Sequence, residues 1–288
     1  MASIQRLAPA KLNLTLDVLA QRDDGYHDLA MVMQSVALGD EISITTGGPQ
    51  GIRVASNLPF LPTGPTNLAA AAAIRLCEDA GVDWNGIDIT LKKVVPVCAG
   101  LGGGSSDAAA VLRSLERMLG TGQDLAALAG IGERVGSDVP YCVLGGTALA
   151  EGRGEVLTPL SALPHCHVVI CKPAFSISTP ELFRAVDGVR LRCRPDTDGV
   201  LAALEAGDLG GVARRMYNVF EDVLPPRQRA EVAAIRSALV QHGALGANMS
   251  GTGPAVFGLF DDADRARSAW EELRQTYRDV FLTETVEQ

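Results

Sequence analysis

The stretch PVCAGLGGGSSD, from Pro96 to Asp107, decides how the middle of this chain folds. The segment IDITLKKVVPV (87–97), which leads into it, is typical of a strand, and residues 108–119 repeat apolar side chains at helical spacing. Consecutive glycines allow positive φ angles and bring backbone N–H groups close to a ligand. A helix start adds unpaired N–H groups and a partial positive charge. The stretch therefore predicts a phosphate-binding loop, and a glycine turn closed by a serine cap is the structural alternative.

The glycine run differs from two common phosphate loops. It lacks the GK[ST] ending of a Walker A loop. The dinucleotide-binding pattern G-x-G-x-x-G also fails, because its last glycine falls on Ser105 when the pattern begins at Gly100 and on Asp107 when it begins at Gly102. The chain is therefore predicted to be neither a P-loop NTPase nor a Rossmann enzyme.

Length and charge restrict the class of protein. A chain of 288 residues is long enough for about two domains. The formal net charge of −9 argues against a nucleic-acid or anionic-membrane partner, because both require a basic surface. A small anionic substrate is compatible with this charge, since backbone N–H groups bind phosphate even on an acidic protein. No long exposed apolar stripe indicates a dimer interface, so we expect a monomer or a weak homodimer.

Cysteine usage and hydropathy predict a cytoplasmic protein. No apolar run reaches the about 18 residues of a membrane span, and the first residues lack the continuous apolar core of a signal peptide. The six cysteines form no CxxC pair, so reduced, mostly buried thiols are expected. His165, Cys166, His167 and Cys171 are metal-ligand types, but strand alternation sends the two histidines to one face and Cys166 to the other. We expect no structural metal.

The pattern of predicted elements changes near residue 160, where TPLSALPHC (158–166) has the composition of a hinge. Before it, alternating residues predict strands, and YCVLGGTALAEGRG (141–154) is predicted to form strands as well. The run TNLAAAAAIRLCEDAG predicts a helix capped by Thr66 or Asn67 and ended by Gly81. Beyond it, strands alternate with helical stretches, one of them at 201–224. We predict an α+β protein with antiparallel sheets, an N-terminal lobe at 1–160 and a C-terminal lobe at 161–288.

Three motifs in order along the chain resemble the kinase superfamily named after galactokinase, homoserine kinase, mevalonate kinase and phosphomevalonate kinase, the GHMP kinases. They are APAKLNL (8–14), GLGGGSSDAA (100–109) and MSGTGPAV (249–256). The resemblance spans nearly the whole chain. It implies a two-lobed fold with a ribosomal-protein-S5-like N-lobe and a ferredoxin-like C-lobe, and it implies ATP with Mg²⁺ as the cosubstrate.

Further stretches resemble one branch of the superfamily, which phosphorylates the 2-hydroxyl of a methylerythritol unit linked to cytidine diphosphate in non-mevalonate isoprenoid biosynthesis. They are RDDGYHDL (22–29), GSDVPY (136–141), STPELF (178–183) and Asn218 with Glu221 in MYNVFEDV. The resemblance thus implies an ATP-dependent small-molecule kinase. A kinase for homoserine, mevalonate or a sugar is the alternative. A nucleotide-binding module without catalysis is a third interpretation, against which the presence of Lys11 and Asp138 argues.

The resemblance also implies roles for charged residues. Asp138 would accept the proton of the substrate hydroxyl, and Lys11 would keep that carboxylate ionised and offset charge on the moving phosphoryl group. A turn residue and a solvated strand lysine are the structural alternatives. Asn13 lies two residues after Lys11, so it shares the same face of the strand, and the resemblance places it beside the substrate.

Tyr26 and His27 are the candidates for substrate specificity. A phenol ring can stack on a pyrimidine and an imidazole can hydrogen-bond to its edge, while Phe183 would close the other side of the base. A loop tyrosine, a surface histidine and an apolar helix residue are the structural alternatives. Asn67 resembles the position that bonds adenine, and a helix cap explains it as well.

Two sets of binding residues follow from the resemblance, and no protein ligand to a metal is assigned. The predicted ATP-binding residues are Asn67, Pro96, Val97, Cys98, Ala99, Gly100, Leu101, Gly102, Gly103, Gly104, Ser105 and Ser106. The predicted substrate-binding residues are Asn13, Tyr26, His27, Asp138, Thr179, Phe183, Gly251 and Thr252.

Overall fold

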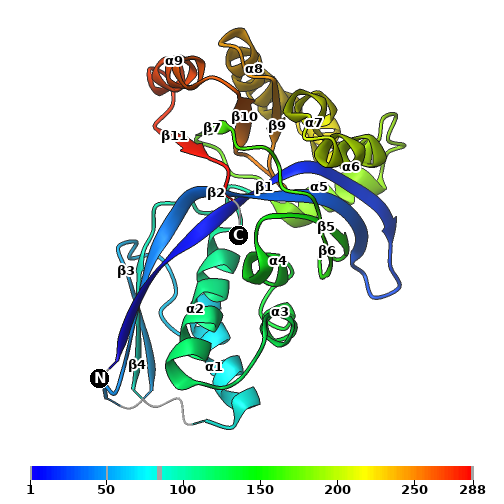
Figure 1. Ribbon diagram of the computed structural model, residues 1–288. Coiled ribbons are helices and arrows are strands. Elements are labelled where there is room, and N and C mark those ends of the chain that lie inside the picture. The colour runs from blue at the N-terminus through cyan, green and yellow to red at the C-terminus, as the bar shows by residue number, and fades with distance from the viewer. Residues whose placement is uncertain (1, 50, 83–85, 287–288) are drawn as a thin grey trace. The chain divides into compact units, whose positions relative to one another are not determined.

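The computed structural model describes residues 2–49, 51–82 and 86–286, which form two compact units (Figure 1). The first unit comprises the chain up to Ala10, Leu38–Val97 and Gly102–Gly145, and the second comprises Lys11–Ala37, Cys98–Leu101 and the chain from Gly146 onward. Strands β1 (Ser3–Gln21) and β2 (His27–Thr46) contribute residues to both units. The division of the chain into lobes at residue 160 stays a prediction.

The first unit combines a sheet with four helices. Strand β4 (Ile87–Lys92) pairs antiparallel with residues 41–46 of β2 and parallel with β3 (Ile52–Ser56). The helices are α1 (Leu68–Ala80), α2 (Gly103–Leu119), α3 (Leu125–Glu133) and α4 (Val139–Leu144). Helices α1 and α2 contact each other extensively, and α4 contacts both α2 and α3.

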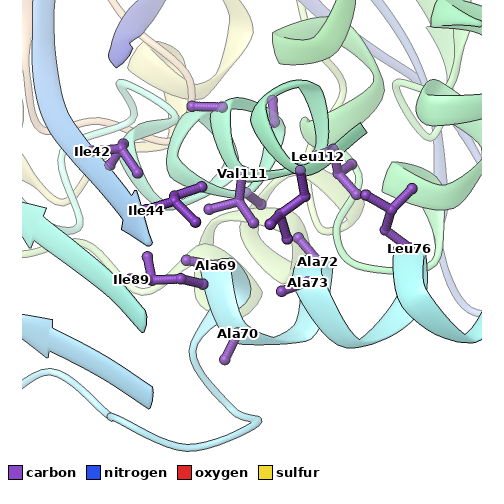
Figure 2. Packing of buried hydrophobic residues seen from close by; sticks show 14 of the residues in the cluster. Ile42, Ile44, Ala69, Ala70, Ala72, Ala73, Leu76, Ile89, Val111 and Leu112 are labelled. Atoms are coloured by element: carbon purple, nitrogen blue, oxygen red, sulfur yellow. The ribbon is translucent and has the colours of Figure 1, made fainter. Parts of the chain in front are cut away.

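Small side chains determine how closely α1 approaches α2. Figure 2 shows Ala69 of α1 and Val111 of α2 beside Ile44 and Ile89, which come from the strands. Methyl side chains such as that of Ala72 allow two helices to pack at short distance. This apolar cluster fixes α2, and with it the start of α2 at the end of the glycine run.

The predicted helix boundaries agree with the structure at α1 and differ at α2. Asn67 is the N-cap of α1, where its side chain accepts from the N–H of Ala69, and Gly81 ends the helix with φ 62°. These two predictions are confirmed. Helix α2 begins at Gly103 rather than at Ala108, so the last glycines and both serines of the loop lie in its first turns.

The second unit contains a four-stranded antiparallel sheet in the order β11-β7-β10-β9. Its strands are β7 (His167–Lys172), β9 (Gly246–Met249), β10 (Val256–Phe260) and β11 (Asp279–Glu284). Helices α8 (Pro226–Gln241) and α9 (Ala263–Arg274) pack against this sheet. Together with the first unit, this arrangement confirms the predicted α+β class.

Further elements of the second unit extend strands β1 and β2. Strand β5 (Thr147–Gly152) pairs with residues 29–34 of β2 and with β6 (Val156–Pro159), and β8 (Tyr217–Asn218) pairs parallel with Thr15 and Leu16 of β1. The remaining helices are α5 (Thr179–Asp187), α6 (Thr197–Glu205), α7 (Leu209–Arg215) and the 3₁₀ helix η1 (Val219–Val223).

Two predicted elements are wrong for local reasons. The helix expected at 201–224 is interrupted because Gly207 turns with φ 65° and the side chain of Asp208 caps a new helix by accepting from the N–H of Gly211. Residues 141–144, expected in a strand, belong to α4. This helix has Pro140 in its first turn, a position that proline favours.

All six cysteines lie among the described residues, and none of them forms a disulfide. Cys77, Cys166 and Cys171 are buried, and Cys98 and Cys193 are exposed. Burial raises the pKa of Cys166 and of Cys171 to about 12, so both remain neutral thiols. Within the described ranges, no group of three or more His, Cys, Asp or Glu side chains is arranged to hold a metal ion. No helix among the described residues has the length and apolar character needed to cross a bilayer.

Candidate active site

A single buried hydroxyl joins the three sequence motifs within the second unit. Oγ of Ser250, which is fully buried, accepts a hydrogen bond from the N–H of Asn13 at 3.2 Å. The same hydroxyl donates to the carbonyl oxygen of Gly100 at 2.8 Å. The first, second and third motifs each contribute one group to this contact, although they are far apart in sequence.

Backbone hydrogen bonds strengthen the same junction. The N–H of Lys11 donates to the carbonyl of Leu101 at 3.0 Å, and the N–H of Ala255 donates to the carbonyl of Ala99 at 3.1 Å. The peptide groups of the glycine-rich loop are thus bound on one side by the first motif and on the other by the third. Because backbone groups make these bonds, they depend on the path of the chain rather than on the loop side chains.

Glycine is required at the contact between the loop and the third motif. Gly100 has φ 77°, and a Cβ atom there would lie 2.0 Å from the carbonyl oxygen of Ser250. Gly251 has φ 56° and would place a Cβ atom 3.0 Å from the carbonyl oxygen of Gly100. Cys98 adopts φ 53°, which is uncommon for a residue with a side chain and indicates local strain.

The start of α2 has the character expected of an anion site. Its N-cap is Gly102, with φ 67° and no side-chain hydrogen bond to the helix. Ser106 does not cap the helix but donates its hydroxyl to the carbonyl of Pro9 at 2.6 Å, which ties α2 to β1 within the first unit. The structural alternative of a serine cap is therefore wrong for Ser106, and the N–H groups of the first turn are left without an N-cap side chain.

Lys11 and Asn13 lie on the same face of β1, as predicted. Nζ of Lys11 donates to Oδ1 of Asn13 at 2.7 Å, and both residues are buried. The amide of Asn13 also contacts Sδ of Met31 at 3.3 Å. A buried ammonium group needs polar partners, so this pair is a functional candidate rather than a solvated lysine.

Asp138 is the N-cap residue of α4, but its side chain makes no capping hydrogen bond. The backbone of the segment is set by other contacts, because the N–H of Val139 donates to the carbonyl of Gly136 at 3.0 Å and the carbonyl of Asp138 accepts from Cys142 at 3.1 Å. The carboxylate is therefore not used to begin the helix.

His27 forms a compact cluster with two residues of α5. Its ring stacks on Phe183 with centroids 4.6 Å apart and planes inclined by 24°, and its Nε2 lies 2.8 Å from Oδ1 of Asp187. Phe183 in turn packs edge-on against Phe220 at 5.0 Å. His27 is 8% exposed, so it is not the surface histidine of the structural alternative.

A cavity adjoins this cluster. It has a volume of about 190 Å³ and is lined by His27, Asp187, Arg194 and the end of β1. The guanidinium of Arg194 donates to Oδ1 of Asp17 and to the carbonyl of Val18, which fixes it at the wall of the cavity. Tyr26 is 54% exposed, and its ring faces the guanidinium of Arg153 at 5.2 Å, a cation–π arrangement.

The third motif is braced by residues of β8 and η1. The amide of Asn218 donates to the carbonyls of Met249 and Gly251, both at 2.8 Å, and Glu221 accepts from the N–H of Met249 at 2.9 Å. Glu221 also pairs with Arg236 at 2.6 Å. Asn218 and Glu221, expected on one helix, therefore lie in a short strand and a 3₁₀ helix and shape the turn after β9.

The other predicted residues occupy separate positions. The hydroxyls of Thr179 and Thr252 lie 2.9 Å apart, which brings the start of α5 to the third motif. Asn67 caps α1 and donates to the carbonyl of Pro62 at 2.8 Å, so its structural role is clear and its contact with adenine stays a prediction.

Sequence reasoning missed two residues that organise the site. Ser250 lies in the third motif, where sequence reasoning considers only the backbone of the turn, because nothing in a glycine-rich turn signals a buried hydroxyl. Asp187 could have been found, since it follows Phe183 by four residues on the same helix and therefore shares its face.

Comparison with known proteins identifies the class of protein that has this fold and this glycine-rich loop. The family model described as "GHMP kinases N terminal domain" matches residues 67–146, and the one described as "GHMP kinases C terminal" matches residues 200–279. The crystal structure of a homoserine kinase from Cytophaga hutchinsonii superposes with a TM-score of 0.76 at 20% identity, covering 100% of this chain and 95% of that chain, which shows the shared fold. The chain belongs to the GHMP kinases, which are ATP-dependent small-molecule kinases.

Within that family, two relatives that match over nearly their full length carry the same name. A 4-diphosphocytidyl-2-C-methyl-D-erythritol kinase from Alkaliphilus metalliredigens is 41% identical over 285 residues, covering 99% of this chain and 97% of the relative. A kinase of the same name from Lachnospira eligens is 42% identical, covering 99% of each chain. The crystal structure of a 4-(cytidine 5'-diphospho)-2C-methyl-D-erythritol kinase is 36% identical with a TM-score of 0.82, covering 99% of this chain and 100% of that chain.

Replacement of Gly100 by alanine tests the close contact with Ser250. We expect Gly100→Ala to lower the free energy of unfolding by about 1–3 kcal/mol more than a control, because the new methyl group overlaps a backbone carbonyl. Gly120→Ala is the matched control, since Gly120 has a similar φ of 63° but open space around its Cβ position. Urea unfolding measures both. Equal losses in the two variants would contradict the contact.

Proposed function

We propose that this chain transfers the γ-phosphoryl group of ATP to the 2-hydroxyl of 4-diphosphocytidyl-2-C-methyl-D-erythritol in non-mevalonate isoprenoid precursor biosynthesis. The observation that carries this proposal is the similarity over 99% of the chain to kinases named for that substrate. The clustered His27, Phe183 and Asp187 support it independently, because they form a site suited to an aromatic base.

The His27 cluster provides a way to recognise cytosine. In the tautomer that carries its proton on Nε2, His27 donates a hydrogen bond to the carboxylate of Asp187 and offers Nδ1 as an acceptor. Cytosine presents an amino donor where uracil presents a carbonyl oxygen. An acceptor at this point therefore favours cytosine, and the exposed ring of Tyr26 supplies a stacking face. The base would lie between Tyr26 and the Phe183 side of the cluster.

The phosphoryl donor would be bound by the glycine-rich loop. The loop from Pro96 to Ser106 would hold the phosphates through the backbone N–H groups that follow Pro96 and through the start of α2, and Asn67 would contact the adenine. Mg²⁺ bound to the phosphates would offset their charge. Asn13, Thr179, Gly251 and Thr252 would position the alcohol substrate, supported by the junction at Ser250 and by the bond between Thr179 and Thr252.

The chemical step requires one proton transfer and one displacement. We assign Asp138 as the base that accepts the hydroxyl proton while the hydroxyl oxygen forms its bond to the γ-phosphorus and the bond to the β-phosphate oxygen breaks, releasing ADP. We assign Lys11 to the developing negative charge, a role that its burial beside Asn13 supports. The protein acts as a monomer or a weak homodimer in this proposal.

A substrate panel tests the proposed function. ADP release with Mg-ATP is measured with 4-diphosphocytidyl-2-C-methyl-D-erythritol, its uridine counterpart, mevalonate, homoserine and galactose. We expect turnover with the cytidine conjugate and a kcat/KM at least about tenfold lower with the uridine counterpart, since the wrong base leaves the His27 acceptor unpaired. Turnover with mevalonate, homoserine or galactose instead would replace the proposed substrate, and ATP binding without turnover in any sample would reject the catalytic proposal.

Replacement of the proposed base tests its role directly. We expect Asp138→Asn to reduce kcat by about 10² or more while the Kd for ATP changes little, because an amide cannot accept the proton. Asp261→Asn is the control, since Asp261 is exposed and has no assigned role. Steady-state kinetics and calorimetric ATP titrations give the two quantities. Wild-type turnover in Asp138→Asn would rule out the assignment.

A further inference from the structure

Three buried charged side chains meet in the first unit, beside the two ends of the glycine-rich loop. Nζ of Lys93 donates to a carboxylate oxygen of Asp40 and to Oδ2 of Asp107, the latter at 2.5 Å. The side chains of Lys93, Asp40 and Asp107 are 4%, 0% and 4% exposed. Charges this deeply buried are costly unless they are paired, so the cluster is a fixed part of the structure rather than a surface ion pair.

The cluster contacts the chain before the loop. Asp40 lies in β2, and its Oδ1 accepts from the N–H groups of Val94 at 2.5 Å and Val95 at 2.8 Å. These peptide groups follow β4 and directly precede Pro96, where the loop begins. One carboxylate thus holds both the backbone that enters the loop and the ammonium group of Lys93.

The cluster also contacts the chain after the loop. Asp107 lies near the start of α2, so its bond to Lys93 connects the entrance of the loop to its exit. Gly103, the first residue of α2, lies close to Val95 and Asp40. A Cβ atom at Gly103 would lie 3.1 Å from Cγ1 of Val95 and 3.5 Å from Oδ2 of Asp40. Lys93 and Asp40 therefore fix both ends of the loop.

Two carboxyl groups share one ammonium group in this cluster. Oδ1 of Asp107 is buried and has no hydrogen-bond partner among the residues that the structure describes. Burial raises the pKa of Asp107 to about 7. The positive charge of Lys93 opposes this upward shift, and the negative charge of Asp40 adds to it. Removing Lys93 would leave two carboxyl groups facing each other without a cation, which is a larger change than removing either carboxyl group.

We propose that Lys93, Asp40 and Asp107 are positioning residues for ATP, which hold the ends of the glycine-rich loop so that its backbone N–H groups converge on the phosphates. This inference rests on the proposed role of that loop in binding ATP. The cluster acts through the backbone, because Asp40 accepts from the N–H groups of Val94 and Val95 and Lys93 pairs with both carboxylates. It is needed because the glycines that let the loop approach a ligand also make the free loop conformationally disordered.

Two neighbouring lysines allow a matched test. Lys93→Gln removes the cation of the cluster, whereas Lys92→Gln removes the same charge from the adjacent residue, which is 62% exposed and pairs with Glu41 at 2.7 Å. We expect Lys93→Gln to raise the Kd for ATP by about tenfold or more and to change the KM of the alcohol substrate by less than about twofold. Lys92→Gln should leave both values unchanged. ATP titration calorimetry and steady-state kinetics, well below the melting temperature of each variant, provide the measurements.

The outcomes separate this inference from the proposed function. Failure of the wild-type protein to bind ATP would reject the proposed function. Wild-type binding with equal Kd values in Lys93→Gln and Lys92→Gln would overturn only the positioning role. A loss of both ATP and alcohol binding in Lys93→Gln would also overturn it, because that result indicates general loss of the fold rather than a misplaced loop.

Hydrogen exchange on the unmodified protein gives a second test that does not depend on a variant folding. If the cluster and the loop are coupled, ATP should slow exchange of the amides of Val94 and Val95, which are bonded to Asp40. The amide of Leu259 in β10 serves as the internal reference. Unchanged exchange at Val94 and Val95 in the presence of saturating ATP would overturn the proposed coupling.

Discussion

Within the second unit, the arrangement of the three motifs depends on the two hydrogen bonds of the Ser250 hydroxyl. This hydroxyl accepts from the N–H of Asn13 and donates to the carbonyl of Gly100, so one buried group satisfies two backbone groups from distant parts of the chain. A buried N–H or carbonyl without a partner costs about 1–3 kcal/mol. The serine therefore favours one specific position of the glycine-rich loop over the many that its glycines would otherwise allow.

This contact explains why the second and third motifs contain glycine where they meet. Gly100 leaves no space for a Cβ atom beside Ser250, and Gly251 faces the backbone of Gly100 in return. The loop itself is divided between the units, with residues 98–101 in the second and residues 102–107 in the first. Each unit thus holds its part of the loop by its own contacts, through Ser250 in the second unit and through Lys93 in the first. A loop fixed at its backbone in this way is prepared to bind phosphate through N–H groups.

The sequence predicted those features that depend on local chemistry. The cap at Asn67, the shared face of Lys11 and Asn13, and the glycine-rich turn followed by a helix each follow from residue types and spacing. It did not predict that α2 would begin at Gly103, because glycine and serine disfavour helix and only packing against α1 and β1 offsets that preference. The interrupted helix at Gly207 was missed because apolar periodicity continues across the break.

The contacts that organise the site could not be predicted from the sequence for a different reason. The bonds of Ser250, the pairing of His27 with Asp187 and the ion pairs of Lys93 connect residues separated by long stretches of chain. Their residue types have ordinary local explanations, namely a turn serine, a helix aspartate and a strand lysine. Only the tertiary fold shows which of the many polar residues are buried and face one another.

The ATP affinity of Ser250→Ala, compared with that of Ser268→Ala, tests this account most directly. Ser268 is exposed and its hydroxyl bonds to the ring of His242, so its replacement controls for loss of a serine hydroxyl. We expect the Kd for ATP to rise by about tenfold or more in Ser250→Ala, since the loop loses the bond that fixes Gly100, and to stay at the wild-type value in Ser268→Ala. A folded Ser250→Ala protein that binds ATP as tightly as the wild type would contradict the claim that this hydroxyl sets the binding conformation of the loop.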